Sequence, residues 1–242
     1  MRILHFSDLH GAATRLAEST IEDVRPDWIV LSGDMLPDFA RLPVQARRLN
    51  AQREWWQTYR SSFLREGIRT TFVLGNHEIE GFEDRSLRAV PAELAGSVGF
   101  LEGIPACWGA WGYSREWEDD ELLEEVLALG EPRVVLSHVP PYGWLDTNSR
   151  GHRIGHLALR EFVDASEESI LRSSPSIGRG LKPPSLVLCG HVHESFGWER
   201  HGPTLVVNAA TGFAVVDLDL VANSAHVVRM ERLLDGPPDH YL

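Results

Sequence analysis

The chain has 242 residues, of which 43% are hydrophobic and 24% charged, and it carries a formal net charge of −12 at pH 7. This length and composition predict one globular domain over residues 1–242, while the charge disfavours nucleic-acid binding and the two cysteines exclude a disulfide scaffold. No run reaches the roughly 18 apolar residues of a membrane span and no signal peptide is evident, so we expect a soluble cytoplasmic protein with no membrane partner.

Short β-branched and leucine-rich runs alternate with segments of helical periodicity. In chain order, strands are expected over residues 3–6, 28–31, 71–74, 134–136, 186–188, 205–207, 213–218 and 225–230. Helices are expected over residues 14–24, 42–65, 84–94, 116–129 and 156–169. The alternation indicates an α/β domain. After residue 186, successive strands with turn residues indicate antiparallel pairing and allow a second sheet packed on the first.

Five of the apolar runs end at polar residues that can bind a metal. These residues are, in chain order, Asp8 and His10, Asp34, Asn76 with His77, His138, and His191 with His193. The carboxyl ends of parallel strands form the ligand crevice of an α/β sheet, so we expect these side chains to converge. Two of the groups are i, i+2 pairs, which an extended backbone points to one side.

The donor types in this set indicate transition metals. The candidate ligands are Asp8, His10, Asp34, Asn76, His138, His191 and His193. Oxygen and imidazole nitrogen without thiolate suit Mn, Fe, Zn, Co or Ni better than Mg or Ca, and we favour Mn or Fe. Seven ligands exceed what one open metal uses; with Asp34 as a bridge they form two four-ligand sites about 3.5–4 Å apart. A single histidine at a strand end is more often structural, but five such motifs in order favour a metal pair.

The order D-x-H, G-D, G-N-H-E, H and G-H-x-H resembles the calcineurin-like metallophosphoesterase superfamily, over residues 8 to 193. The resemblance implies an α/β fold of two mixed β-sheets packed face to face and flanked by helices. It implies one ion bound by Asp8, His10, Asp34 and His193. It implies a second ion bound by Asp34, Asn76, His138 and His191.

The same resemblance assigns catalytic roles to two further residues. His77 is implied to be a non-ligand histidine beside the substrate phosphate, and Glu78, where most members have Asp, to support its ring. Two divalent ions that share an oxygen ligand can lower the pKa of a bound water to about 7, and the resulting hydroxide would attack phosphorus. His77 would then donate a hydrogen bond or a proton to the leaving alkoxide.

A narrower similarity points to the substrate. Residues 134–212, including Ser137 to Gly143 and Asp146, are similar to small members grouped with class III cyclic-nucleotide phosphodiesterases. We therefore expect hydrolysis of a small phosphodiester. A phosphomonoesterase, then a nuclease, then a non-catalytic scaffold are the alternatives, and self-association is left open.

The segment 140–156 follows His138 and carries the candidate substrate contacts. These are Tyr142, Arg150, His152 and Arg153. An aromatic ring with nearby guanidinium groups could stack on a base and bind a phosphate. The alternative is a loop that folds onto itself and keeps Arg150 and Arg153 in solvent. We interpret Ser32 and Ser137 as strand-end packing and assign no role to His5.

Overall fold

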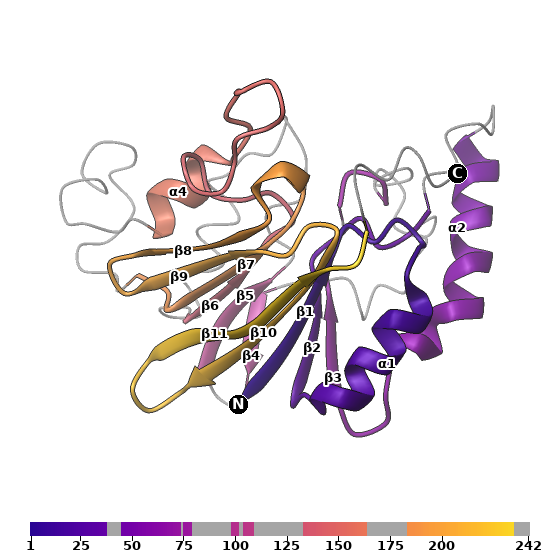
Figure 1. Ribbon diagram of the computed structural model, residues 1–242, viewed down its shortest axis with the longest axis horizontal. Coiled ribbons are helices and arrows are strands. Elements are labelled where there is room, and N and C mark those ends of the chain that lie inside the picture. The colour runs from indigo at the N-terminus through magenta and orange to yellow at the C-terminus, as the bar shows by residue number, and fades with distance from the viewer. Residues whose placement is uncertain are drawn as a thin grey trace.

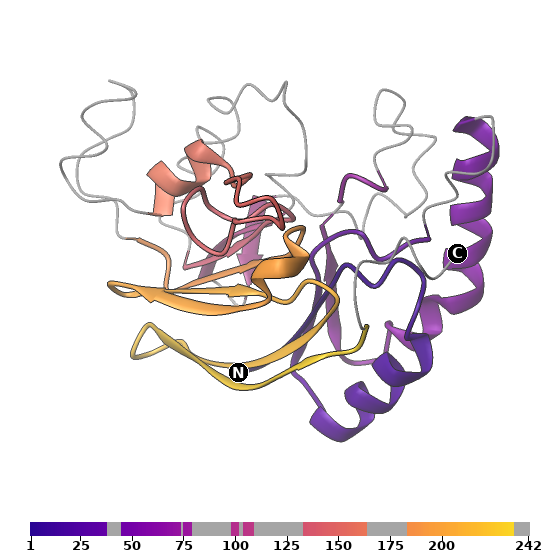
Figure 2. The same cartoon turned by 45° about the horizontal axis from the view of Figure 1, so that its top comes forward.

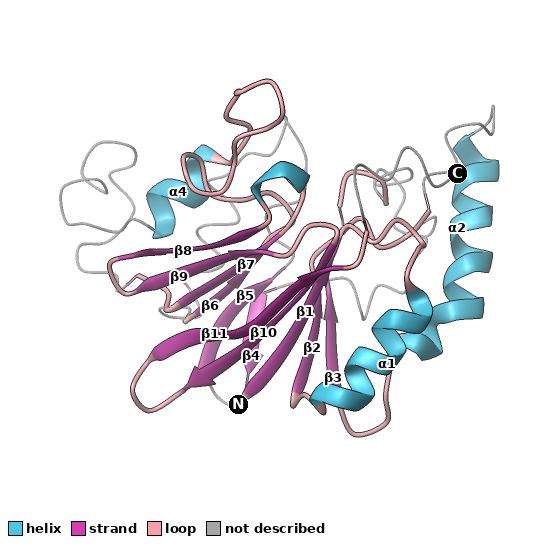
Figure 3. Ribbon diagram, in the orientation of Figure 1, coloured by secondary structure: helices cyan, strands magenta, loops and turns pink. Residues whose placement is uncertain are grey.

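The computed structural model describes residues 1–37, 45–73, 75–78, 98–101, 104–108, 133–163 and 183–234 (Figure 1). The strands of these segments form two sheets, one of five strands and one of six. Figure 3 shows the strands fanning out between the helices α1 (Thr14–Val24) and α2 (Gln45–Tyr59) on one side and α4 (Leu157–Val163) on the other. None of the described helices is long and apolar enough to cross a membrane.

The five-stranded sheet has the order β11-β10-β1-β2-β3. Its strands are β1 (Arg2–Ser7), β2 (Trp28–Leu31), β3 (Arg69–Phe72), β10 (Gly212–Asp219) and β11 (Ser224–Arg232). The strands β1, β2 and β3 are parallel, whereas β10 is antiparallel to both β1 and β11. This sheet is therefore mixed, and its three parallel strands end at one edge.

The six-stranded sheet has the order β4-β5-β6-β7-β9-β8. Its strands are β4 (Val98–Leu101), β5 (Ile104–Trp108), β6 (Val134–Leu136), β7 (Leu186–Cys189), β8 (Gly197–His201) and β9 (Thr204–Asn208). Parallel pairing joins β5, β6, β7 and β9, and the two outer strands, β4 and β8, are antiparallel to their neighbours. This sheet is mixed as well.

The two sheets bury a shared core. Ile3 and Val30 of one sheet lie in the same buried cluster as Leu136 and Leu188 of the other. Figure 2 shows the resulting layers, with the orange β8–β9 ribbon over the yellow β10–β11 ribbon.

The opposite face of the five-stranded sheet is covered by helices. Leu4 and Phe6 of β1 alternate with the residues that face the other sheet, and they pack with Ile21 of α1 and Trp56 of α2. Burial on both faces explains why β2 is apolar throughout. The prediction of two mixed sheets flanked by helices is confirmed.

Several element boundaries differ from the sequence prediction. The strands β4, β5 and β8 were not predicted; in β8 the middle three residues are exposed, which gives no apolar run at this sheet edge. β9 runs parallel to β7, so the region after residue 186 is not purely antiparallel. The helix predicted over 42–65 is α2 followed by a 3-10 turn, Arg60–Ser62. The predicted helices 84–94 and 116–129, and residues 164–169, lie outside the described residues.

Candidate metal centre

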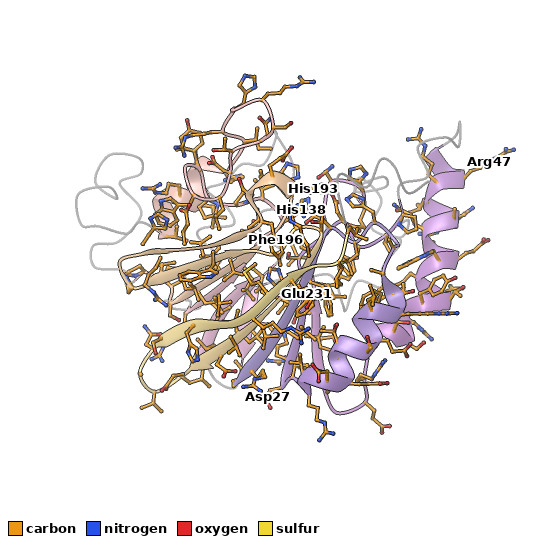
Figure 4. All side chains as sticks on the ribbon, in the orientation of Figure 1. Asp27, Arg47, His138, His193, Phe196 and Glu231 are labelled. Carbon is orange, nitrogen blue, oxygen red and sulfur yellow. The ribbon has the colours of Figure 1, made fainter. Side chains whose placement is uncertain are left out.

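The candidate ligands lie where the carboxyl ends of the parallel strands of both sheets meet. Asp8, Asp34 and Asn76 follow the parallel strands β1, β2 and β3, and His138 and His191 follow β6 and β7 of the other sheet. Figure 4 shows His138 and His193 at this end of the strands.

Backbone hydrogen bonds join these strand ends. The N–H of Asp8 donates to the carbonyl of Gly33, and the N–H of His10 donates to that of Asp34. The N–H of Gly190 donates to the carbonyl of His138. The convergence predicted from chain order is therefore present in the structure.

The backbone at four of these residues is left-handed. The φ angles are 54° at Asp8, 45° at His10, 51° at Asp34 and 67° at His191. Non-glycine residues adopt this region rarely, and such strain gathers at functional sites. The prediction that the i, i+2 pairs are extended is wrong, because β1 ends at Ser7 and the chain turns at each ligand. The side chains meet through these turns instead.

Three glycines allow the ligand loops to approach each other. A Cβ atom on Gly75 would overlap Oδ1 of Asp34, and one on Gly33 would overlap Nδ1 of His138. A Cβ atom on Gly190 would overlap Oδ2 of Asp8. The missing side chains are thus required for the close packing of the ligands.

Asp34 lies at the middle of the cluster. Its Oδ2 atom is 3.3 Å from Nε2 of His138, 3.8 Å from Nε2 of His77 and 4.0 Å from Nε2 of His10. Its Oδ1 atom accepts a hydrogen bond from the N–H of His77 at 2.9 Å. One carboxylate therefore faces imidazole rings from both sheets.

Asp8 and Asn76 complete the cluster on either side of Asp34. Oδ1 of Asp8 is 3.1 Å from Nε2 of His193, and Oδ2 accepts the N–H of His191 at 2.9 Å. Oδ1 of Asn76 lies 3.0 Å from Nε2 of His138.

Three groups of side chains in this cluster could each bind a metal ion. They are Asp8 with His10 and His193; His10 with Asp34 and His77; and Asp34 with His138 and His191. Within each group the ligand atoms lie within 4.8 Å of one another. His10 gives an independent sign of fit: its side chain is 6% exposed and its Nε2 atom has no hydrogen-bond partner. A buried imidazole nitrogen without a hydrogen-bond partner is costly, and a bound ion would satisfy it.

The electrostatics favour ionised carboxylates. Burial alone would raise the pKa of Asp34, but His138, His10 and His77 lower it well below its usual range. For His138, burial opposes protonation, yet the charges of Asp34 and Asp8 outweigh it and raise the pKa to about 10. In the metal-free protein the cluster is thus a network of ion pairs between carboxylates and protonated imidazoles. A metal cation can take the place of the imidazole protons.

Glu78 has a role that the resemblance did not imply. Its side chain is buried, and Oε2 accepts the N–H groups of Asp34 at 2.7 Å and Gly75 at 2.8 Å. Oε1 accepts the N–H of Leu36 at 2.9 Å. Glu78 therefore ties the loop after β2 to the loop after β3. Burial and the charge of Asp34 raise the pKa of Glu78 to about 7.

Two other residues near the site were missed by sequence reasoning. Gln52 of α2 donates from Nε2 to the carbonyl of His77 at 2.8 Å. His5 is fully buried in β1, and its Nε2 atom lies 2.7 Å from Oγ of Ser32. Ser32 is thus not merely packing, because a histidine from the neighbouring strand contacts its hydroxyl. A sequence motif cannot reveal these contacts, because each joins two residues that are far apart along the chain.

The segment after His138 folds onto itself around a buried carboxylate. Oδ2 of Asp146 accepts the N–H of Gly143 at 2.8 Å and that of Gly155 at 3.3 Å. Oδ1 lies 3.3 Å from Nη1 of Arg153, whose side chain is half exposed. The loop thus folds onto itself, as in the alternative interpretation, but Arg153 pairs with Asp146 instead of remaining free in solvent.

The other candidate substrate contacts lie on the outside of this loop. The tip is a turn in which Oδ1 of Asn148 accepts the N–H groups of Arg150 and His152, and both residues are exposed. Tyr142 is 42% exposed, with the guanidinium of Arg153 6.0 Å from its ring centre.

A family model described as calcineurin-like phosphoesterase matches residues 1–195. The chain belongs to this family. Membership implies metal-dependent hydrolysis of phosphoesters, typically at a dinuclear metal site, and the acidic and histidine cluster is suited to such a site. The match ends directly after the last candidate ligands.

Solved structures share the calcineurin-like fold. A dimetal phosphatase from Danio rerio is 14% identical with a TM-score of 0.58, and the alignment covers 89% of this chain and 92% of the other. A protein from Thermus thermophilus is 16% identical with a TM-score of 0.54, over 95% of this chain and 99% of the other. A search of curated proteins gives no match.

Proposed function

We propose that this calcineurin-like protein hydrolyses a small phosphodiester, such as a cyclic nucleotide, at a pair of divalent metal ions, with Mn or Fe preferred. The observation that carries the proposal is the set of overlapping ligand groups around Asp34, next to the buried Nε2 atom of His10, which has no hydrogen-bond partner. Overlapping groups are what a shared bridging carboxylate requires. The Danio rerio chain with this fold is named a dimetal phosphatase, which supports the metal pair but not the choice of a diester.

The family resemblance implies how the side chains divide between two ions, and the ligand groups are compatible with that division. One ion would be bound by Asp8, His10, Asp34 and His193. The other would be bound by Asp34, Asn76, His138 and His191. Support comes from the group of Asp8, His10 and His193 on one side of Asp34 and the contact of His138 with Asn76 on the other.

A bound metal pair supplies a Lewis acid for the phosphoryl oxygens and lowers the pKa of water at the site. The protein's own contribution is orientation and proton transfer. His77 has a side chain that is 28% exposed, so it is open to substrate, and its ring lies edge-on to that of His10. We assign to His77 the protonation of the leaving alkoxide, a step worth typically 10²–10⁴-fold in rate.

The charge of the loops favours a diester over a monoester. No lysine or arginine occurs at positions 8–10, 34–36, 75–78, 138–140 or 190–193, all of which are described. A phosphodiester carries one negative charge and a phosphomonoester about two. A diester therefore needs fewer cationic side chains for binding, and the lack of lysine and arginine at these positions fits a diester. The exposed Tyr142 would stack on the organic part of the ester, with Arg153, which pairs with Asp146, beside its ring and Arg150 and His152 further out on the same loop.

A paired assay tests this proposal. The purified protein is loaded with Mn²⁺ and given bis-p-nitrophenyl phosphate and p-nitrophenyl phosphate in parallel, with the Asp34→Asn variant as the control for contaminating hydrolases. We expect a higher kcat/KM for the diester, and activity that Asp34→Asn removes. A higher kcat/KM for the monoester would replace the diester assignment, and no hydrolysis of either ester by metal-loaded protein would contradict an enzymatic function.

A further inference from the structure

The turn that carries His193 is held by a side chain from the end of the last strand. Arg232 closes β11, and its Nη2 atom donates a hydrogen bond to the carbonyl oxygen of His193 at 2.8 Å. The same guanidinium lies over the ring of Phe196, 4.9 Å from its centre. Arg232 thus contacts the first residue of the 3-10 turn His193–Ser195 and the residue that follows the turn.

The backbone after Arg232 is anchored beside the metal centre. The N–H groups of Leu233 and Leu234 both donate to the carbonyl of Thr211, at 2.9 and 3.1 Å. The N–H of Thr211 donates in turn to the carbonyl of Ser7, the residue before Asp8. Thr211 is fully buried and has a left-handed φ of 67°. The base of the Arg232 side chain is therefore fixed relative to Asp8.

A second side chain holds the residue between the two histidines. Asn208, which is fully buried, donates from Nδ2 to the carbonyls of Val192 at 3.0 Å and Leu145 at 3.3 Å. Its Oδ1 atom accepts the N–H of Ala210 at 2.9 Å. The amide therefore ties the histidine turn to the loop after His138. Like Arg232, Asn208 lies beyond residue 195, where the family match ends.

We infer that Arg232 is a positioning residue for the ligand His193, with Asn208 fixing the residue before it. A three-residue turn has few internal hydrogen bonds with which to fix its own orientation, and Nε2 of His193 lies 3.1 Å from Oδ1 of Asp8. Anchoring the carbonyl of His193 limits rotation of this turn and keeps the ring aimed at the ion shared with Asp8 and His10. This inference rests on the proposed metal pair.

The chain offers a matched control on the same strand. Arg229 is also an exposed arginine of β11 whose guanidinium lies over a ring, that of Phe213, at 5.1 Å. It pairs with Asp23 and Glu231 rather than with a ligand turn. Arg229→Met therefore removes an equal charge and a similar ring contact, but at a position away from the metal centre.

The test is a calorimetric titration of the metal-free protein with Mn²⁺ for the wild type, Arg232→Met, Arg232→Lys and Arg229→Met. Loss of an outer-shell partner of a ligand typically lowers metal affinity about 10–100-fold. We expect Arg232→Met to lower the affinity for one of the two ions by this factor and the affinity for the other by less than about threefold. Arg232→Lys should recover part of the lost affinity, and Arg229→Met should change neither affinity. Unchanged affinities in Arg232→Met, or an equal loss of both ions matched by Arg229→Met, would overturn the inference.

Hydrogen exchange gives a readout that needs no metal. The N–H of Ser195 donates to the carbonyl of Val192 within the turn. In metal-free Arg232→Met we expect this amide to exchange faster than in the wild type, with the amides of β11 near Arg229 unchanged; equal exchange at Ser195 would count against positioning. If the wild type itself binds no Mn²⁺, the proposed function fails, whereas this exchange result still shows whether Arg232 orders the turn.

Discussion

The carbonyl oxygen of Ser32 accepts a hydrogen bond from Nδ1 of His138 at 2.9 Å, while Nε2 of the same ring faces Oδ2 of Asp34 at 3.3 Å. Because a carbonyl can only accept, Nδ1 carries a proton and Nε2 is the atom left for a metal. The hydroxyl of Ser32 also contacts His5. The backbone at the end of β2 therefore fixes the orientation of the His138 ring.

Metal binding should release protons. The pKa of His138 is about 10 in the metal-free protein, so its ring is protonated at pH 7 and must lose the Nε2 proton to bind an ion. We expect release of at least one proton on Mn²⁺ binding at pH 7.5, and an affinity that rises with pH until about pH 10. Calorimetry in two buffers of different ionisation enthalpy measures this release; identical enthalpies in both buffers would contradict it.

His5 should make the metal-free protein sensitive to acid. Burial lowers the pKa of His5 to about 3, against 6.5 in the unfolded chain. Between these values the unfolded state binds the extra proton, so the free energy of unfolding falls as pH drops from 6.5 toward 3, by up to ~1.4 kcal/mol per pH unit from this group. His5→Gln cannot titrate, and its urea unfolding curves from pH 7 to pH 4 should show a shallower decline. The carboxylates titrate in both proteins, so an equal decline would refute the assignment to His5.

His77 separates catalysis from metal binding. We expect His77→Ala to keep two Mn²⁺ ions per chain and to lose about 10²–10⁴-fold in kcat, because only the proton donor to the leaving group is removed. Metal content by elemental analysis and kcat on bis-p-nitrophenyl phosphate measure the two effects. Since His77 also lies within reach of His10 and Asp34, loss of one ion in this variant would make it a ligand instead.

Glu78 should stabilise the ligand loops rather than act on substrate. Gln has one acceptor oxygen, so Glu78→Gln turns an amide N–H₂ toward one of the three backbone N–H groups that the carboxylate now accepts. An unsatisfied buried donor costs about 1–3 kcal/mol, and we expect the free energy of unfolding of the metal-free protein to fall by this amount. Urea denaturation measures the change. An unchanged free energy of unfolding, with only kcat reduced, would restore the catalytic role.

Much of the site follows from the sequence because of where the strands end. Asp8, Asp34 and Asn76 come after three strands that are both parallel and adjacent, so their order along the chain becomes proximity in space. The same holds for His138 and His191 in the second sheet. The apolar runs reveal these strands because they are buried on both faces.

The remaining features depend on contacts between distant segments. Asp8 and Asp34 both have a left-handed backbone, which aspartate tolerates better than most residues but which the sequence pattern alone does not predict. Arg232 lies 39 positions after His193 and reaches it only because β11 ends beside the site. The polar edge strand β8 has no apolar alternation to reveal it.

The most direct test of a dinuclear centre bridged by Asp34 is a Mn²⁺ titration followed by electron paramagnetic resonance, with Asp34→Asn alongside. Two Mn²⁺ ions held by Asp34 together, about 3.5–4 Å apart as in other two-metal sites, would couple magnetically. We predict two ions per wild-type chain with a coupled multiline spectrum, and weakened binding of both ions in Asp34→Asn. A six-line spectrum of isolated Mn²⁺ at saturation, or full metal content in Asp34→Asn, would contradict the bridged pair.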